Sequence, residues 1–383
     1  MLIYILLFTF VGSALLQLYY WLFVFSKLAF LNSTEGGSVV YPNSVSNVKI
    51  SDNSFEEALQ SVSIIICARN EADNLVRNLP LILEQNYPFP FEIIVVDDAS
   101  IDNTPLILNQ FAAAYSNLKV INITEKKIKG KKGALAAGIE AAQYEWLLLT
   151  DADCYPLSKN WVFDMMKGVN GKEIGLAYAP YQKRDGFLNK FIRFETVWTA
   201  TQYMGFALAG EPYMGVGRNL IYKKKLYKKA GGFEKHEHIA SGDDDLFINS
   251  VISKKNFKII LEPSTFMCSL PKTRWNAYFT QKNRHFSTST SYILRHQIML
   301  GLLSASHFLF FVTAFLLLAL KISTIFVLIL IVVRTLVVWF FYGKILRKFQ
   351  EDDLLHWIPL LDVVYLLFYL VFLPALTIRA QKW

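Results

Sequence analysis

Two carboxylates separated by a single residue, Asp151 and Asp153, directly follow an apolar run at residues 145–150. Such a pair at the exposed end of a buried strand can reach one divalent cation, and a diphosphate can fill the remaining coordination positions. A solvated turn after a strand is the alternative interpretation of an Asp-x-Asp triplet. The other motifs of the chain decide between the two, and they favour a metal and diphosphate site.

Three consecutive acids, Asp243, Asp244 and Asp245, precede an apolar stretch that predicts a short helix at residues 246–252. One or two acids at a helix start would stabilise the helix dipole. Three adjacent carboxylates repel one another, which costs stability unless a cation or a catalytic role compensates. A carboxylate held there could take the proton from an acceptor hydroxyl as that hydroxyl attacks a sugar carbon.

Polar residues also follow two other predicted strands. Residues 68–71, Ala-Arg-Asn-Glu, come after the first strand, and Asp98 closes the second. An acid at such a position can accept a hydrogen bond from the imide of a base or bind ribose hydroxyls, although helix capping would explain several of these residues as well. Lys131 opens a later helix, where lysine and backbone N–H groups are directed toward an anionic phosphate.

The elements that position these residues alternate along the chain. Strands are expected at residues 62–68, 91–96, 118–123 and 145–150, separated by helices at 71–85, 104–114 and 132–142. This rhythm predicts a parallel sheet whose ligands bind beyond the carboxyl ends of the strands. The sequence has neither a Walker loop nor a dinucleotide fingerprint, which argues against an ATPase and a Rossmann dehydrogenase.

The ends of the chain predict a membrane protein. The chain has 383 residues, of which 53% are hydrophobic, and residues 2–25 carry no charged side chain. Further apolar stretches lie at residues 298–320, 322–342 and 357–373. A helix of about 20 apolar residues can cross a bilayer. We expect an N-terminal transmembrane helix at 1–26, a linker at 27–61, a domain at 62–290 and a C-terminal membrane region at 291–383.

The C-terminal region has two or three spans, because Asp362 and two prolines make the last stretch equally consistent with a helix lying at the interface. Arg334 and Asp362 are either functional intramembrane charges or residues that face a protein interior. The net charge of +8, with basic residues in the middle domain and beside the spans, predicts a domain on the cytoplasmic side of a bacterial-type plasma membrane. Cys67, Cys154 and Cys268 lack metal-ligand spacing, and no disulfide framework is expected.

Seven motifs in order resemble those of the family-2 glycosyltransferases. They are Ala68-Arg69-Asn70-Glu71, Asp97-Asp98-x-Ser100, Gly130-Lys131-x-Gly133, Asp151-x-Asp153, Gly215-x-Gly217-x-Asn219, Gly231-Gly232-Phe233 and Gly242-Asp243-Asp244-Asp245. The resemblance covers residues 62–285. It implies a GT-A fold, which is an α/β domain with a Rossmann-like mixed sheet, here flanked by transmembrane helices, and an inverting reaction.

The resemblance also implies roles for individual residues. It assigns Ala68, Arg69, Glu71 and Asp98 to the nucleotide base and ribose, Lys131 to the diphosphate, Asp151 to the ribose or sugar beside the metal, and Asp153 to Mg or Mn. The general base is Asp244 when the acids are aligned on Gly242, and Asp243 when they are aligned on Asp245-Leu246; we favour Asp244. Residues 214–219, with Gly215, Gly217 and Asn219, would line the acceptor side.

One departure from the family concerns residues 281–285, Gln-Lys-Asn-Arg-His. Membrane-bound polymerising members carry Gln-x-x-Arg-Trp here, and the tryptophan stacks on the acceptor sugar. Gln281 and Arg284 could still bind the diphosphate, but His285 replaces the tryptophan at the acceptor. This replacement argues against processive synthesis.

The sequence therefore predicts a metal-dependent hexosyltransferase of polysaccharide biosynthesis. It would move a sugar, expected to be UDP-linked, to a hydroxyl of a lipid-linked or membrane-proximal glycan, with no nucleic-acid partner. Two alternatives remain. A sugar-nucleotidyltransferase would be expected to show a glycine-rich phosphate loop where residues 68–71 lie, and a transporter or receptor would leave the ordered acids unexplained.

Overall fold

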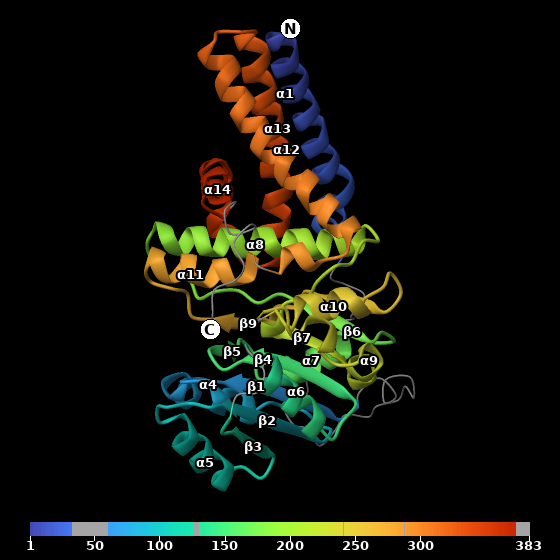
Figure 1. Cartoon of the computed structure of the whole chain (residues 1–383), viewed down its shortest axis with the longest axis vertical. Helices are drawn as coiled ribbons and strands as arrows, with labels where there is room; N and C mark the ends of the chain where they lie inside the picture. Colours follow the sequence, from blue (N-terminus) through green and yellow to red (C-terminus); the bar gives the residue numbers. More distant parts are fainter. Residues whose placement is uncertain (33–59, 126–129, 240, 287, 373–383) are drawn as a thin grey trace. The chain divides into compact units, whose positions relative to one another are not determined.

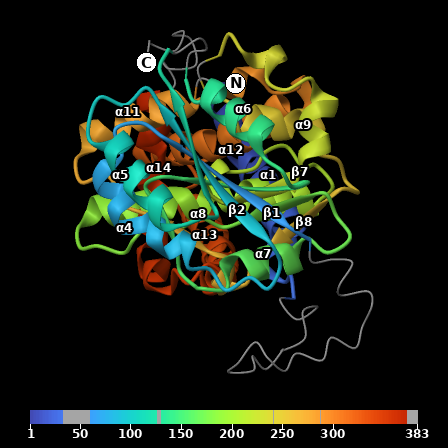
Figure 2. The ribbon, with the colours of Figure 1, turned by 90° about the horizontal axis from the view of Figure 1, so that it is seen from below.

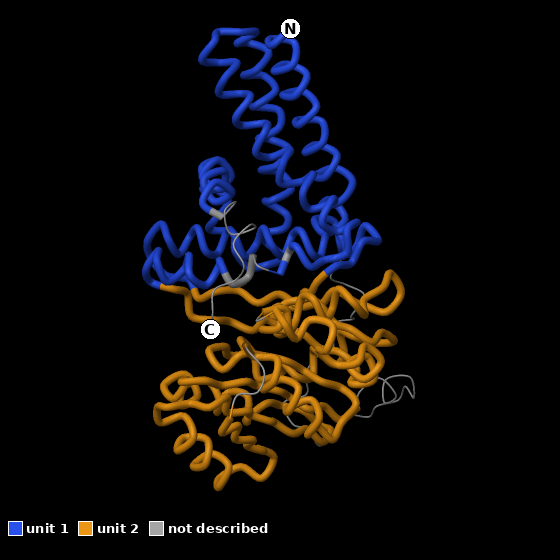
Figure 3. Tube along the Cα trace, viewed as in Figure 1, with its two compact units in different colours: residues 1–31, 183–213, 273–381 blue, residues 32–182, 214–272, 382–383 orange. Residues whose placement is uncertain are grey.

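The structure of the protein, a computed structural model, describes residues 1–32, 60–125, 130–239, 241–286 and 288–372. The chain divides into two compact units, which Figure 3 shows in blue and orange. The helical unit comprises residues 1–31, 183–213 and 273–381, and the sheet unit comprises 32–182, 214–272 and 382–383. The domain expected at 62–290 is thus shared between both units, and most of the expected linker lies outside the described residues.

The sheet unit is built around a seven-stranded sheet in the order β3-β2-β1-β4-β7-β6-β8. Its strands are β1 (Val62–Ala68), β2 (Phe91–Asp98), β3 (Leu118–Ile123), β4 (Trp146–Asp151), β6 (Ile174–Ala177), β7 (Leu220–Lys223) and β8 (Phe257–Ile260). The first four run parallel, as predicted, whereas β7 is antiparallel to β4 and β6. A short antiparallel pair, β5 (Cys154–Pro156) and β9 (Met267–Ser269), lies outside this sheet. The predicted mixed sheet is confirmed.

Helices cover both faces of the parallel strands because these strands are apolar on both sides. The helices are α4 (Ala72–Leu83), α5 (Thr104–Ala114), α6 (Lys132–Ala141) and α7 (Trp161–Gly168). Side chains of α4, α5 and α7 share one core with Ile64 and Ile66 of β1. α6 lies against the other face, where a Cβ on Gly138 would come within 2.7 Å of Ile65. Figure 2 shows β1 and β2 side by side among these helices, so the strand ends are the part of the sheet left for a ligand.

Among its described residues, the helical unit contains four helical segments long and apolar enough to cross a membrane, at residues 2–29, 294–319, 324–348 and 352–371 (Figure 1). The first joins α1 (Leu2–Tyr19), a π-helical turn η1 (Tyr20–Phe25) and α2 (Ser26–Ala29); the others are α12 (Leu294–Ala319), α13 (Thr324–Lys348) and η8 (Asp352–Trp357) with α14 (Ile358–Phe372). The 15 residues of α14 alone extend about 22 Å, which is less than the hydrocarbon core.

Arg334 and Asp362, the charges in the predicted spans, face the interior of the helical unit and pair with each other. The Arg334 guanidinium donates to Asp362 and, through Nε, to Gln17 Oε1 over 2.8 Å. His307 Nε2 lies 3.0 Å from the same Asp362 carboxylate. These side chains come from α1, α12, α13 and α14, so one polar network joins all four elements.

We expect Arg334→Leu to lower the free energy of unfolding by about 3–5 kcal/mol, because it leaves the Asp362 carboxylate buried without its cation. The measurement is denaturant unfolding in detergent micelles, followed by tryptophan fluorescence. Arg347→Leu is the control, since this arginine side chain on the same helix is 76% exposed. Adding Asp362→Leu to Arg334→Leu should recover most of the loss. If Arg334→Leu and Arg347→Leu have equal free energies of unfolding, the structural role of the Arg334–Asp362 pair is contradicted.

The amphipathic pattern at residues 186–208 forms α8 (Phe187–Leu208), which belongs to the helical unit. Its charged residues do not make an exposed polar face. Arg193 is buried and donates to Glu351 and Asp353, and Glu195 pairs with Lys282 of α11 (Trp275–Phe286). The helix therefore uses its charges for internal ion pairs, which favours packing within the helical unit over contact of this helix with a membrane surface.

Candidate active site

The register of the parallel strands brings the predicted polar residues to one edge of the sheet. Ala68 lies opposite Asp97, and Cys67 lies opposite Asp151 on the other neighbouring strand. Asp98, the last residue of β2, is buried. The ends of β1, β2 and β4 therefore meet at the same place, as the carboxyl ends of neighbouring parallel strands must.

Hydrogen bonds tie the loops after β1 and β2 to each other. The Asn70 N–H donates to Ser100 Oγ, and the Ile101 N–H donates to Asn70 Oδ1, each over 2.9 Å. Asp102 accepts from the Thr104 N–H over 2.9 Å just before α5, whose N-cap residue is Asn103. Asn70 and Asp102 are thus occupied with holding the loops. The Glu71 carboxylate accepts from Asn74 Nδ2 over 2.5 Å, and Arg69 is exposed.

Asp151 and Asp153 come together as the sequence predicts. One ligand atom from each, together with Cys154 Sγ, lies within 4.8 Å of the others, which is the only such group among the described residues. Burial, followed by the charge of Asp151, raises the pKa of Asp153. Burial also raises the pKa of Glu71, and the charges of Asp153 and Asp151 add to this. Crowded carboxylates of this kind are stabilised by a divalent cation with oxygen ligands, so the residues fit Mg or Mn.

Cys154 is a poor candidate for the third ligand. Its Sγ lies 2.9 Å from Ser269 Oγ, and burial holds the pKa of the thiol well above its ordinary value. Metals bind the thiolate rather than the thiol. The carboxylates of Asp151 and Asp153 therefore define the site, and Cys154 packs beneath it; no disulfide forms among the three cysteines.

Lys131 connects the Asp-x-Asp pair with the acid triplet. Its Nζ donates to Asp151 Oδ1 and lies 4.0 Å from Asp243 Oδ2. Burial alone would lower the pKa of Lys131, but the charges of Asp151, Cys67 and Asp243 outweigh it and raise the pKa well above its usual value. Lys131 thus remains a cation at the place where the diphosphate is predicted.

The acid triplet surrounds the start of α10 (Asp245–Val251), one residue earlier than predicted. Asp244 caps this helix: Oδ1 accepts from the Asp245 N–H and Oδ2 accepts from the Gly217 N–H, each over 2.7 Å. Burial and the charges of Asp243 and Asp245 raise the pKa of Asp244 to about 8. Asp243 therefore faces Lys131, whereas Asp244 faces the glycine loop.

That glycine loop, predicted at the acceptor side, contains the short helix η4 (Gly217–Asn219). A Cβ on Gly217 would lie 3.1 Å from Asp244 Oδ2, and one on Gly215 would lie 2.9 Å from Leu220. Asn219 differs from the prediction. Its side chain is fully buried, accepts from Trp161 Nε1 and donates to two backbone carbonyls, so it supports the loop from beneath instead of facing an acceptor.

Lys132 follows Lys131, the lysine predicted to bind phosphate, but its side chain points into the protein interior. It is completely buried, and its Nζ donates to the carbonyls of His236 over 2.5 Å and Ile239 over 2.8 Å. These carbonyls precede the acid triplet, whose charges oppose the lowering of the Lys132 pKa by burial. Lys132 therefore ties the segment before the triplet to the start of α6.

Arg218, between Gly217 and Asn219, is a site residue that the sequence analysis did not single out. Its guanidinium carbon lies 4.4 Å from the centre of the Tyr181 ring, and Nη1 donates to Ser269 Oγ over 2.9 Å. Its charge opposes the effect of burial on the pKa of Asp153. The sequence feature that could have identified Arg218 is its place between Gly217 and Asn219, in a loop already predicted to line the site.

Gln281, Arg284 and His285 lie on α11 of the helical unit. The side chains of Arg284 and His285 are outside the described residues. The predicted contacts of these three residues with diphosphate and acceptor remain predictions.

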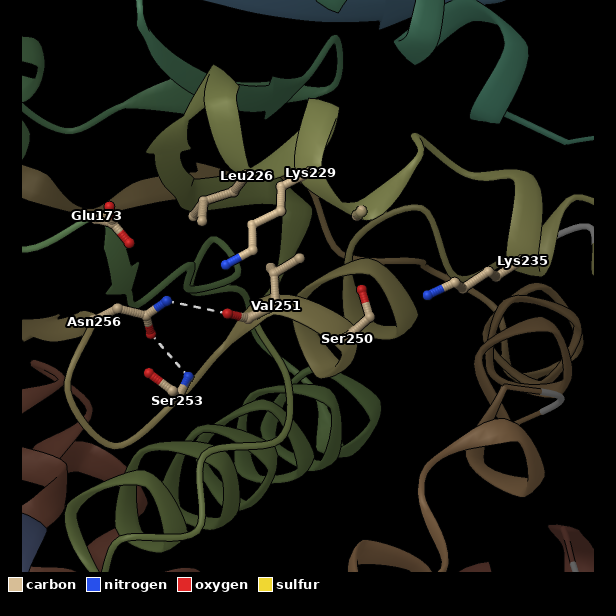
Figure 4. A pocket seen from close by; sticks show the side chains of 9 residues that line it. Glu173, Leu226, Lys229, Lys235, Ser250, Val251, Ser253 and Asn256 are labelled. Atoms are coloured by element: carbon tan, nitrogen blue, oxygen red, sulfur yellow. Dashed lines mark hydrogen bonds between the residues drawn. The ribbon is translucent and has the colours of Figure 1, made fainter.

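A hollow of about 380 Å³ lies elsewhere in the sheet unit, beside α9 (Lys224–Ala230) and the end of α10. Lys229, Lys235 and Asn256 are among the residues that line it (Figure 4). Asn256 is held by Val251 and Ser253 of the same lining. None of the strand-end acids contributes to this hollow, so it is separate from the candidate active site.

Part of the chain, drawn from both units, matches a known family. Residues 63–231 match the model for glycosyl transferase family 2, so the chain carries a family-2 glycosyltransferase domain. The match confirms the family that the ordered motifs predict.

Two curated relatives show the same likeness. Glycosyltransferase AglE of Haloferax volcanii is 34% identical over 119 residues, which cover 31% of this chain and 38% of AglE. Probable glycosyltransferase YdaM of Bacillus subtilis is 27% identical over 237 residues, which cover 59% of this chain and 54% of YdaM. The chain thus spans between 38% and 54% of the length of these relatives.

A solved structure extends the likeness to the fold. Mannosyltransferase PcManGT from Pyrobaculum calidifontis, in complex with GDP-Man and Mn²⁺, matches with a TM-score of 0.56 and 19% identity, covering 95% of this chain and 97% of its own. At this identity the likeness concerns the fold alone. It confirms the predicted GT-A architecture.

Proposed function

We propose that this protein is an integral-membrane glycosyltransferase. It transfers a sugar from a nucleotide sugar to a hydroxyl of a lipid-linked or membrane-proximal glycan. The observation that carries the proposal is the arrangement of Asp151 and Asp153 beside Lys131, with Asp243 and Asp244 next to them, at the strand ends of a family-2 domain.

The donor side consists of Asp151, Asp153 and Lys131. The two carboxylates would hold Mg or Mn, which when bound stabilises the negative charge of the departing diphosphate. PcManGT, whose structure contains GDP-Man and Mn²⁺, supports metal use with a nucleotide sugar. Lys131 adds a permanent positive charge beside Asp151, and Glu71 and Asp98 are close enough to the strand ends to bind the nucleoside. We expect a UDP-linked donor and include GDP-linked donors in the test.

We assign the general base to Asp244. A base must reach the acceptor, and Asp244 contacts Gly217 in the loop predicted to line the acceptor side, whereas Asp243 faces Lys131. The raised pKa of Asp244, about 8, gives its carboxylate a strong affinity for a proton. Asp243 is the alternative base, and it is matched against Asp244 in the experiment below.

The reaction is a single displacement that inverts the anomeric carbon. The acceptor oxygen forms a bond to the sugar C1 while the bond from C1 to the diphosphate oxygen breaks. The hydroxyl proton passes to Asp244, and the electron pair of the broken bond leaves with the nucleoside diphosphate. Gly217 lets the backbone of its loop approach the Asp244 carboxylate closely, because a Cβ there would lie 3.1 Å from Oδ2.

The helical unit supports a membrane location with a cytoplasmic catalytic domain. Lys348 donates to the carbonyl of Leu31, and Lys344 lies 4.9 Å from the ring centre of Phe30, so basic residues of α13 lie at the end where the first helical segment ends. Arg347 and Lys27 add to this charge. Basic residues favour the cytoplasmic side of a plasma membrane, and the acceptor would then be met at the inner surface.

The test uses the full chain in detergent or in native membranes, with a panel of UDP- and GDP-sugars and Mg²⁺ or Mn²⁺. We expect release of free nucleoside diphosphate from one donor, and loss of release when EDTA removes the metal. Release of pyrophosphate instead would identify a sugar-nucleotidyltransferase. No sugar-dependent release from any donor, together with no nucleotide binding, would favour the transporter or receptor alternative.

A further inference from the structure

We propose that Arg218 binds the diphosphate of the donor as a second protein cation beside Asp153. This assignment rests on the proposed function, and it adds a residue that neither the family motifs nor the comparisons assign. Three observations carry it: the way Arg218 is held, the donors it leaves unused, and the charges around it.

Arg218 is held rigidly at the edge of the Asp-x-Asp site. Its guanidinium stacks on Tyr181 at 4.4 Å, and Nη1 donates to Ser269 Oγ over 2.9 Å. Ser269 is the end of β9, and it pairs in register with Cys154, the residue after Asp153. The same short strand pair therefore fixes both Asp153 and the partner of Arg218, so their separation varies little.

Most of the hydrogen-bonding capacity of Arg218 is unused. A guanidinium carries five N–H donors, and within the described residues Ser269 is the one acceptor that Arg218 bonds. The side chain is half-buried, so the remaining donors retain access to a ligand. Stacking on Tyr181 leaves the edge of the planar group available. Such an edge matches two oxygens of one phosphate.

The surrounding charges indicate an anionic ligand. Burial lowers the pKa of Arg218, but the neighbouring groups outweigh burial and raise it, with Tyr181 and Cys154 ahead of Asp153 and Asp151. Lys131 already neutralises Asp151 through a direct ion pair. A divalent cation, Lys131 and Arg218 set against Asp151, Asp153 and Asp243 would leave one excess positive charge, and a nucleoside diphosphate supplies the anionic oxygens that compensate it. The metal and the diphosphate are thus expected to bind together.

The experiment compares Arg218→Met and Arg218→Lys with the unaltered full chain in detergent. Calorimetry measures the affinity for UDP and GDP, and for UMP and GMP, each with Mn²⁺. We expect Arg218→Met to lower the affinity for whichever diphosphate, UDP or GDP, the chain binds by about 10- to 100-fold, since hydrogen bonds to charged groups contribute this much. The affinity for the corresponding monophosphate, UMP or GMP, should fall less than about threefold, because Arg218 is proposed to bind the diphosphate. Arg218→Lys, which keeps the charge and loses the planar fork, should lie between the two.

Arg347→Met is the matched control, because this arginine side chain is 76% exposed and lies in the helical unit. Thermal unfolding of each variant checks that it is folded. Unchanged diphosphate affinity in folded Arg218→Met would overturn the inference, and so would an equal loss for monophosphate and diphosphate, which would assign Arg218 a role in the shape of the site. If the unaltered chain binds no nucleotide, the proposed function falls and this inference falls with it.

Discussion

Asp153→Ala is expected to reduce metal-dependent release of nucleoside diphosphate by about 10³-fold or more. Asp153 is the better placed of the two carboxylates to hold the metal, because Lys131 already pairs with Asp151. A metal contributes several kcal/mol to stabilising a departing diphosphate, and each 1.4 kcal/mol is tenfold in rate. The measurement is the Mn²⁺-dependent part of the release rate, with EDTA as the zero point.

Asp153→Asn and Glu84→Ala make this test specific. Asparagine keeps the shape of Asp153 and removes its charge, so it should lose the metal dependence as alanine does. The Glu84 side chain is 53% exposed and pairs only at 3.9 Å with Lys159, so its removal should leave the rate unchanged. Full metal-dependent turnover in Asp153→Asn would refute the assignment of Asp153 as a metal ligand.

Asp153→Asn should be more stable to unfolding than the unaltered chain when metal is absent. Burial and Asp151 raise the pKa of Asp153 in the folded chain, so the folded state binds a proton more readily than the unfolded state does. Ionised Asp153 therefore opposes folding above its unfolded pKa, and this cost grows as pH rises toward the folded pKa. Removing the charge relieves it. Mn²⁺ with the diphosphate should raise the unfolding midpoint of the unaltered chain but not of Asp153→Asn.

The local sequence was sufficient to predict the four parallel strands of the sheet and the strand-end acids, but not β6, β7 and β8. The apolar runs ending at Ala68, Asp98 and Asp151 each become a parallel strand of this sheet. Parallel strands place their carboxyl ends together whatever the details of the loops. The meeting of Asp151 with Lys131 follows from this rule, because both belong to the segments that flank one crossover helix.

Residues whose position depends on distant partners could not be predicted in the same way. Asn219 has the sequence context of an acceptor loop, but its amide is taken up by Trp161 and two carbonyls from other parts of the sheet unit. Arg193 is likewise placed by a distant partner, because Glu351 lies 158 residues further along the chain. Such partners are set by tertiary contacts that neither helical spacing nor composition encodes.

The base assignment leads to the second large effect. Asp244→Asn is expected to lower kcat by about 10²- to 10⁴-fold, the usual contribution of a general base, while donor binding is retained. In the unaltered chain kcat/KM should rise with pH through about 8, because the carboxylate accepts a proton only after losing its own and its pKa is raised to about 8. This rise should disappear in Asp244→Asn.

Asp243→Asn separates the two candidate bases, because each carboxylate has a different neighbour. Asp243 faces Lys131 at 4.0 Å, so its replacement should weaken donor binding and raise KM. The rise of kcat/KM with pH should remain but move to lower pH, because the charge of Asp243 helps to raise the pKa of Asp244. Asp244 contacts Gly217 and the Asp245 N–H, and an asparagine there can still accept from one of them and keep α10 in place. If instead Asp243→Asn abolishes the pH dependence and Asp244→Asn preserves it, the proton goes to Asp243 and Asp244 serves to position the acceptor loop.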